Sequence, residues 1–173
     1  MTITARLEDA RLLIEHGRWE GALLSVLVAM AATAHLRFPQ GTPSRAKPGA
    51  EMRDCERFEL FVAEALAQMS PLPDMSFGFK GQVRPFGELL YKWLRCKLAH
   101  EADLPPEIGF EPDPKPVHLA ISQRPGPPER IVFTHSVVIL LADMVARAAE
   151  NADVPKQLRQ EILDLFRHGL GAV

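Results

Sequence analysis

The sequence predicts a mainly α-helical protein, a single-domain bundle of about five to six helices with one small inserted β-hairpin at about residues 117–134. Apolar residues recur at intervals of three and four through most of the chain, which is the period of an amphipathic helix. The pattern changes to short β-rich runs only in the hairpin region. With 173 residues the chain can build one full hydrophobic core, whereas two half-length domains would each be marginal. We therefore treat residues 1–173 as one domain.

The composition is that of an ordinary globular protein, with 47% apolar and 24% charged residues. The formal net charge of −2 provides no global positive field, so any contact with RNA would need a local basic patch. Two cysteines cannot form a disulfide framework. The N-terminus lacks the pattern of a secretory signal, and the longest apolar run is too short to cross a bilayer. We therefore expect a cytoplasmic protein with no membrane contact.

Two helices are expected at the start of the chain. Residues 4–16 alternate apolar and charged side chains with a helical period, and they predict a helix with Thr4 as N-cap and Gly17 past its end. Residues 19–36 are apolar on nearly every side, which predicts a central helix covered by others. A loop follows, because Pro and Gly recur in residues 38–49.

A third helix is expected from Asp54, as its cap, to about Met69. Its glutamates, Glu56, Glu59 and Glu64, are expected on the solvated face of that helix.

A fourth helix is expected after a loop at residues 71–82. Pro85 suits the first turn of this helix, which continues to about His100. A proline-rich connector is then expected at residues 105–116.

The C-terminal part begins with the hairpin, whose strands are expected at residues 117–122 and 130–134. A lone hairpin is marginally stable, so it must pack against the helices. Two further helices are expected, at Ser136–Asn151 and from Pro155 onward.

Side chains capable of chemistry are concentrated near the end of the fourth helix, where four residues separate Arg95 from His100. This Arg-x4-His pattern follows a Leu- and aromatic-rich stretch. Here the chain resembles the HEPN superfamily (higher eukaryotes and prokaryotes nucleotide-binding domains), helical bundles with an Arg and then a His at the end of a core helix. The Ala-rich helical hairpin that begins near Leu12 is also similar to the opening of that family. The likeness covers about residues 5–105 and 135–170.

The resemblance implies a metal-independent endoribonuclease from a defence or toxin–antitoxin setting, in which the ribose 2′-hydroxyl attacks the adjacent phosphate. His100 would transfer the proton, because imidazole titrates near neutral pH. Arg95 would stabilise the charge that builds on the phosphate with its planar guanidinium. Five helical residues turn through about 140°. The two side chains therefore converge only if the helix ends near His100, or if a homodimer forms a composite site from two chains, and we expect the homodimer.

Tyr91, Lys97 and Glu101 are expected to shape the substrate-binding part of this site. Tyr91 lies one turn before Arg95 and shares its face. Directly after the Arg, many active HEPN members have a polar residue, whereas this chain has Cys96, a weak hydrogen-bonding group. The alternative expectation is therefore a non-catalytic HEPN-like module that binds a nucleotide, RNA or a protein partner such as an antitoxin.

A purely structural interpretation of the same residues is also open. A His near a helix C-terminus is favourable by about 0.3–1 kcal/mol. Arg95 could pair with an acidic residue such as Glu88 or Glu101, or simply stay solvated. A metal site made of Cys55, Cys96 and His100 lacks any Cys-x-x-Cys or His-x-x-x-His spacing. A Gly-rich phosphate loop is also missing from the sequence, so we expect neither a metal nor a cofactor.

Overall fold

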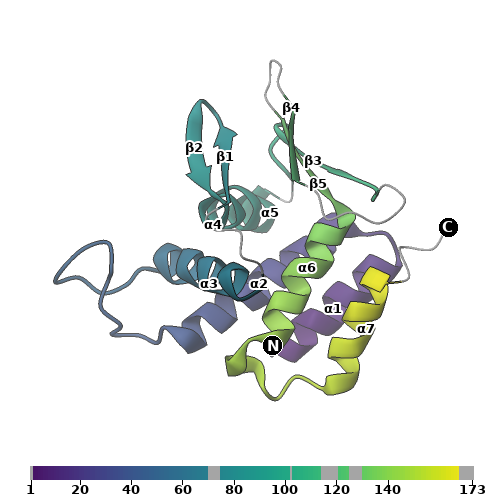
Figure 1. Ribbon diagram of the computed structural model, residues 1–173, viewed down its shortest axis with the longest axis horizontal. Helices are drawn as coiled ribbons and strands as arrows, with labels where there is room; N and C mark the ends of the chain where they lie inside the picture. Colours follow the sequence, from purple (N-terminus) through teal and green to yellow (C-terminus); the bar gives the residue numbers. More distant parts are fainter. Residues whose placement is uncertain (1, 70–74, 102, 114–120, 125–129, 168–173) are drawn as a thin grey trace.

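The computed structural model describes residues 2–69, 75–101, 103–113, 121–124 and 130–167, and it is mostly helical with two small sheets (Figure 1). The helices are α1 (Ile3–Glu15), α2 (Trp19–Arg37), α3 (Asp54–Met69), α4 (Phe86–Glu88), α5 (Cys96–Glu101), α6 (His135–Arg147) and α7 (Lys156–Arg167). A π-helical segment, η1 (Leu89–Arg95), joins α4 to α5, and a 3₁₀ turn, η2 (Ala149–Asn151), follows α6. The strands are β1 (Ser76–Phe79), β2 (Gln82–Pro85), β3 (Ile108–Glu111), β4 (Ile121–Arg124) and β5 (Arg130–Thr134).

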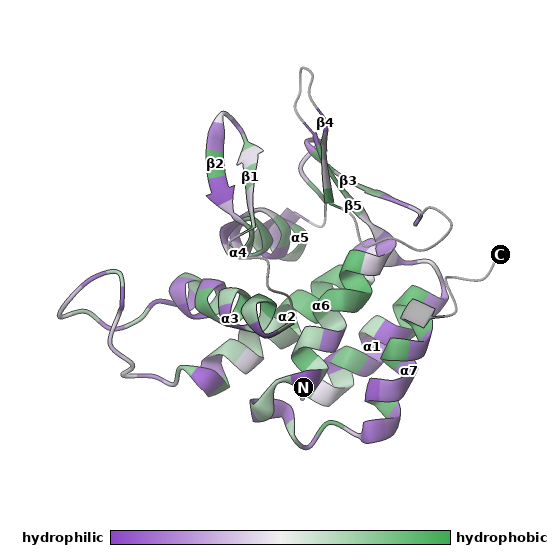
Figure 2. Cartoon of the chain, viewed as in Figure 1, coloured by the Kyte–Doolittle hydropathy of each residue, from purple (hydrophilic) through white to green (hydrophobic). Residues whose placement is uncertain are grey.

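The core is organised around α2, as its apolar sequence predicts. This helix packs against α1, α3 and α6, and most of its hydrophobic residues (Figure 2) are buried or half-buried. Among the described helices, α2 is the one long and apolar enough to cross a membrane by length and composition, and 50% of its apolar window is buried in the fold. That degree of burial is also found in the core helices of proteins that do not enter membranes.

The predicted N-terminal helices are confirmed, with two changes at their ends. Thr2 rather than Thr4 caps α1, because its hydroxyl oxygen accepts a hydrogen bond from the Ala5 amide at 3.2 Å. Gly17, with φ of +67°, follows the end of α1 as expected. Asp54 is the first helical residue of α3 and not the residue before it. A carboxylate is also favourable there, at the positive end of the helix dipole.

The fourth predicted helix is confirmed as one continuous rod from Phe86 to Glu101. Its middle turn is π-helical, and the amide of Cys96 donates to the carbonyl oxygen of Tyr91, five residues earlier. The sequence did not predict this wider turn.

The expected loop at residues 71–82 is wrong for its second half, where β1 and β2 form an antiparallel hairpin. Lys80 and Gly81 make its two-residue turn, with φ of +52° and +72°. Two positive φ angles belong to the type I′ turn, whose twist matches the paired strands. Residues 71–74 lie outside the described residues.

The predicted hairpin near residues 117–134 is present as antiparallel β4 and β5, with residues 117–120 outside the described part of the chain. The connector predicted at residues 105–116 is wrong in its middle, because β3 lies there and pairs in parallel with β5. The sheet therefore has the order β3-β5-β4. Phe133 on β5 ties this sheet to the helices, with its ring centroid 6.3 Å from that of Phe86.

The predicted helix at Ser136–Asn151 is confirmed up to Arg147, and its last residues turn into η2 instead. The buried side chain of Asn151 explains this ending, because its amide donates to the Val145 carbonyl at 2.7 Å and to the Thr33 hydroxyl at 2.9 Å. The final helix, α7, begins after Pro155 as predicted.

Candidate functional site

The candidate site begins with Arg95, the last residue of η1. Its guanidinium carbon lies 5.2 Å from the centroid of the Tyr91 ring, within cation–π distance. Both side chains leave the same side of the rod because four residues make nearly one turn. The predicted pairing of Tyr91 with Arg95 is therefore present in the fold.

Arg95 has no anionic partner among the described residues. Its Nε atom is buried without a hydrogen bond, and no described carboxylate forms an ion pair with the guanidinium. The acids proposed for it are occupied elsewhere, since Glu88 pairs with Arg84 and Glu101 pairs with Lys97. The structural interpretation in which Arg95 forms an ion pair with Glu88 or Glu101 is therefore wrong.

Tyr91 is half-buried between the rod and α3, where its ring lies 5.3 Å from that of Phe58. Burial raises the pKa of the Tyr91 phenol, and Arg95 opposes that shift through its positive charge. Cys55 and Cys96 flank the phenol from α3 and α5. The phenol therefore stays protonated at neutral pH and can donate a hydrogen bond.

His100 lies in the last turn of α5 and is exposed. The stretch from Cys96 onward is α-helical, so the rotation of about 140° between Arg95 and His100 expected from helix geometry applies. No hydrogen bond or ring contact joins the two among the described residues. One chain by itself thus presents Arg95 and His100 on different faces.

Lys97 and Glu101, predicted to bind substrate, form an ion pair with each other one turn apart on α5. Their charges are mutually compensated, and neither touches Arg95 or Tyr91 among the described contacts. Cys96 is half-buried and its thiol is free. Of the five predicted site residues, the fold brings together Arg95 and Tyr91.

One comparison identifies a relationship for this chain. A family model described as Rv1289 matches residues 2–165. The chain belongs to the Rv1289 family. This is a family of unknown function, and the match contains no link to the HEPN superfamily. Neither the curated proteins nor the solved structures contain a significant match.

This member of the Rv1289 family also has a basic cluster that the sequence did not predict, on the other side of the rod. Lys80, Arg84 and Lys92 surround the ring of Trp93, with Lys80 Nζ 4.6 Å from a ring centroid of that indole. The cluster depends on the β1–β2 hairpin, which brings Lys80 and Arg84 to the rod. Because the sequence interpretation had a loop there, it could not predict this contact.

The described residues contain no group of three or more His, Cys, Asp or Glu side chains able to hold a metal ion. The three glutamates expected on the solvated face of α3 are all partly exposed, and two of them also bind neighbouring side chains or loop amides. Glu56 accepts hydrogen bonds from the Ser44 hydroxyl and two loop amides, and Glu64 pairs with Arg37 and Arg45. The remaining member, Glu59, is half-buried.

Proposed function

We propose that this protein binds a phosphate-bearing ligand, RNA or a nucleotide, through Arg95 and Tyr91. The observation that carries the proposal is the Arg95 guanidinium, which forms no ion pair with any described carboxylate, since Glu88 and Glu101 are paired elsewhere. A phosphate oxygen would compensate this charge by accepting a charge-assisted hydrogen bond from the guanidinium. The Tyr91 ring contacts the guanidinium, whose planar set of donors can bind two oxygens of one phosphate.

The Trp93 cluster, on the other side of the rod from Arg95, is a second candidate contact for a phosphate, although its Lys80 and Arg84 are already paired with Glu107 and Glu88. Lys92 lies on the rod between Tyr91 and Trp93 and has no ion-pair partner among the described residues. Basic side chains next to aromatic rings are typical of surfaces that bind single-stranded nucleic acid. The net charge of −2 would confine such binding to this local patch.

Binding is tested by fluorescence anisotropy with a labelled single-stranded RNA, in parallel for the wild type, Arg95→Ala and Arg95→Lys. We expect Arg95→Ala to weaken binding about tenfold or more, since a charge-assisted hydrogen bond contributes about 1.5–3 kcal/mol. Arg95→Lys should recover part of the affinity, because it keeps the charge but loses the planar donors. The matched control is Arg18→Ala, which removes an exposed arginine without a described partner.

The salt dependence of the same titration separates a phosphate contact from a general loss of charge. Loss of one phosphate contact should reduce the slope of log affinity against log salt by about 0.7 for a single strand. An unchanged affinity for Arg95→Ala, or an equal loss for Arg18→Ala, contradicts the proposal.

A second candidate function is the metal-independent endoribonuclease implied by the HEPN resemblance. The observation that favours it is His100, which is exposed in the last turn of α5 with no described partner to hold it. Because Arg95 and His100 diverge within one chain, this activity requires a homodimer in which His100 of one protomer faces Arg95 of the other. Arg95 would stabilise the phosphate charge and His100 would transfer the proton.

The composite site has a specific test, the cleavage of single-stranded RNA in EDTA by a mixture of two inactive variants. Arg95→Ala and His100→Ala should each abolish cleavage. Random exchange of their protomers should then restore about a quarter of the sites, because half of the dimers are mixed and each mixed dimer has one complete site. If both variants cleave as fast as the wild type, the nuclease function is excluded. If the mixture stays inactive, the composite site is excluded.

A further inference from the structure

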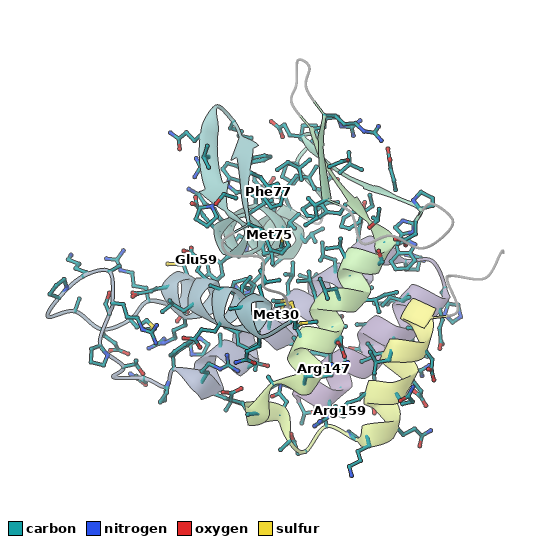
Figure 3. All side chains as sticks on the ribbon, viewed as in Figure 1. Met30, Glu59, Met75, Phe77, Arg147 and Arg159 are labelled. Atoms are coloured by element: carbon teal, nitrogen blue, oxygen red, sulfur yellow. The ribbon has the colours of Figure 1, made fainter. Side chains whose placement is uncertain are left out.

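A cavity of about 400 Å³ lies between α3 and the β1–β2 hairpin, away from Arg95. Its wall is mainly apolar and includes Val62, Leu66, Met75 and Phe86. Figure 3 shows Glu59, Met75 and Phe77 on the side of α3 that faces the hairpin. A volume of this size is sufficient for a small organic molecule.

Glu59 is the one acidic residue of this wall. It is half-buried, and among the described residues it has neither a hydrogen-bond nor an ion-pair partner. The neighbouring acids are both engaged, Glu56 with the Ser44 hydroxyl and Glu88 with Arg84. Glu59 therefore differs from the other carboxylates on this side of the protein in having no cation or donor to compensate it.

The position of Glu59 is fixed by a close approach between α3 and α4. A Cβ atom added to Gly87 would lie 3.0 Å from the Cα of Glu59, which is tighter than nine in ten Cβ contacts in proteins. The glycine thus lets the two helices touch at this point. As a result the Glu59 side chain lies beside Phe86, at the border between the apolar wall and solvent.

We propose that this cavity binds a small primary amine in its protonated form, with the ammonium group on the Glu59 carboxylate and a short hydrocarbon chain against the apolar wall. A carboxylate with an adjoining apolar surface matches both parts of such a molecule. The proposal is independent of the function proposed for Arg95, because the two sites share no residue.

The electrostatics of Glu59 agree with this assignment. Burial raises the pKa of the Glu59 carboxyl, and the charges of Glu88 and Glu56 raise it further. An ammonium ion at the carboxylate would counteract that effect. Binding should therefore weaken as the pH falls through the raised pKa of Glu59, at a higher pH than for an ordinary glutamate.

The test is an NMR titration of the ¹⁵N-labelled full chain with hexylammonium chloride, and with 1-hexanol and sodium hexanoate as ligands of equal chain length. We expect saturable shifts at about millimolar hexylammonium, centred on Val62, Leu66 and Met75, with weaker binding of the other two ligands. Glu59→Gln preserves shape and removes charge, and it should weaken hexylammonium binding about tenfold or more. Glu8→Gln removes an exposed, unpaired charge on α1 and should leave binding unchanged.

A second variant assigns the binding to this cavity. Glu59 also borders a smaller cavity of about 350 Å³ beside Cys55. Of these two cavities, Ala63 borders only the larger. Ala63→Leu should therefore block hexylammonium while Glu59 remains in place.

Two results overturn the proposal. One is equal binding of hexylammonium by the wild type and Glu59→Gln, and the other is equal binding of hexylammonium and hexanol by the wild type.

Discussion

The guanidinium carbon of Arg95 lies 5.2 Å from the ring centroid of Tyr91, one turn earlier in the π-helical segment η1. The ring of Tyr91 in turn packs on Phe58 of α3, at 5.3 Å between centroids. Tyr91 is thus a support between the core and the guanidinium. Single π-helical turns are frequent at functional sites, and here the wider turn is the one that ends in Arg95.

Two substitutions of Tyr91 should distinguish the contribution of its ring to RNA binding from that of its hydroxyl. Tyr91→Phe keeps the surface under Arg95, so RNA affinity should change less than about threefold, whereas Tyr91→Ala removes the ring and about 1 kcal/mol of cation–π interaction. Tyr91→Ala should also reduce the free energy of unfolding by about 2 kcal/mol, since the aromatic side chain is half-buried. Anisotropy and urea unfolding of both variants measure the two effects.

Titration of the Tyr91 hydroxyl predicts a difference in the pH dependence of stability between the wild type and Tyr91→Phe. Because burial raises the pKa of Tyr91, its contribution to stability is complete below the unfolded-state value of 10.0 and is lost as the pH rises through the folded-state pKa. The stability of Tyr91→Phe should not show this loss above pH 10. Equal RNA affinities for Phe and Ala at this position would show that the ring does not support Arg95.

The pair between Arg37 of α2 and Glu150 of η2 should contribute to stability. Arg37 Nε donates to Glu150 at 2.8 Å, and the two side chains are 15% and 20% exposed. Glu150→Gln should therefore reduce the free energy of unfolding at neutral pH by about 2 kcal/mol. Chemical denaturation against pH measures this, with the exposed Glu8→Gln as the control.

The pH dependence of this effect follows from the hydrogen bond of Arg37, which lowers the pKa of Glu150. The stabilisation is present above the unfolded-state value of 4.5 and disappears as the pH falls through the lowered folded-state pKa. The wild type and Glu150→Gln should therefore converge in acid. A constant difference down to pH 2 would exclude the ion pair as its cause.

The long helices could be predicted from the sequence, because each buries one stripe whose apolar period is local. The hairpin β4–β5 could be predicted for the same reason, because β-branched residues lie in the sequence on both sides of a Pro- and Gly-rich stretch. The β1–β2 hairpin and β3 could not be predicted from local sequence. Ser76–Phe79 is only four residues long and contains Gly78, and β3 is stabilised by pairing with β5, more than 20 positions later in the chain. Such a partner is not visible in local composition.

In the candidate site, the contact between Arg95 and Tyr91 could be predicted because it depends on helical spacing alone. The surroundings of Trp93 could not, since Lys80 and Arg84 reach it from the missed hairpin. The role of Glu56 was likewise hidden, because its partners are backbone amides of a distant loop. Sequence periodicity assigns a helix face to solvent without showing which loop returns to cover it.

Glu56 should hold the loop that precedes α3. Its carboxylate accepts the Ser44 hydroxyl at 2.8 Å and the amides of Arg45 and Ala46 at 2.7 and 3.1 Å. Glu56→Ala leaves the Ser44 hydroxyl and the two amides without their carboxylate acceptor, so the loop should open locally more often and trypsin should cleave faster after Arg45. Mass spectrometry of a timed digest identifies the cleaved bonds.

Two controls accompany the digest. Glu20→Ala, an exposed acid at the start of α2, should leave the cleavage pattern as in the wild type. The hydrogen bonds lower the pKa of Glu56, so its hold on the loop is present above the unfolded-state value of 4.5 and is lost as the pH falls through the folded-state pKa. Unchanged cleavage after Arg45 in Glu56→Ala would mean that other contacts fix the loop.

The close approach of α3 and α4 at Gly87 can be tested by comparing this glycine with Gly21, which has more room around it. At Gly87 a new Cβ would lie 3.0 Å from the backbone Cα of Glu59, so the backbone of α3 must shift by a few tenths of an ångström in Gly87→Ala. Because this backbone is packed in the core, the substitution should reduce the free energy of unfolding by about 1–3 kcal/mol. At Gly21, inside α2, a Cβ would meet only the Leu13 side chain, at 3.4 and 3.6 Å. Gly21→Ala should therefore be neutral or stabilising by up to about 1 kcal/mol, because Ala favours the helix. Thermal unfolding of both variants measures the contrast, and equal effects of the two substitutions would show that α4 can move away from Glu59 at no cost.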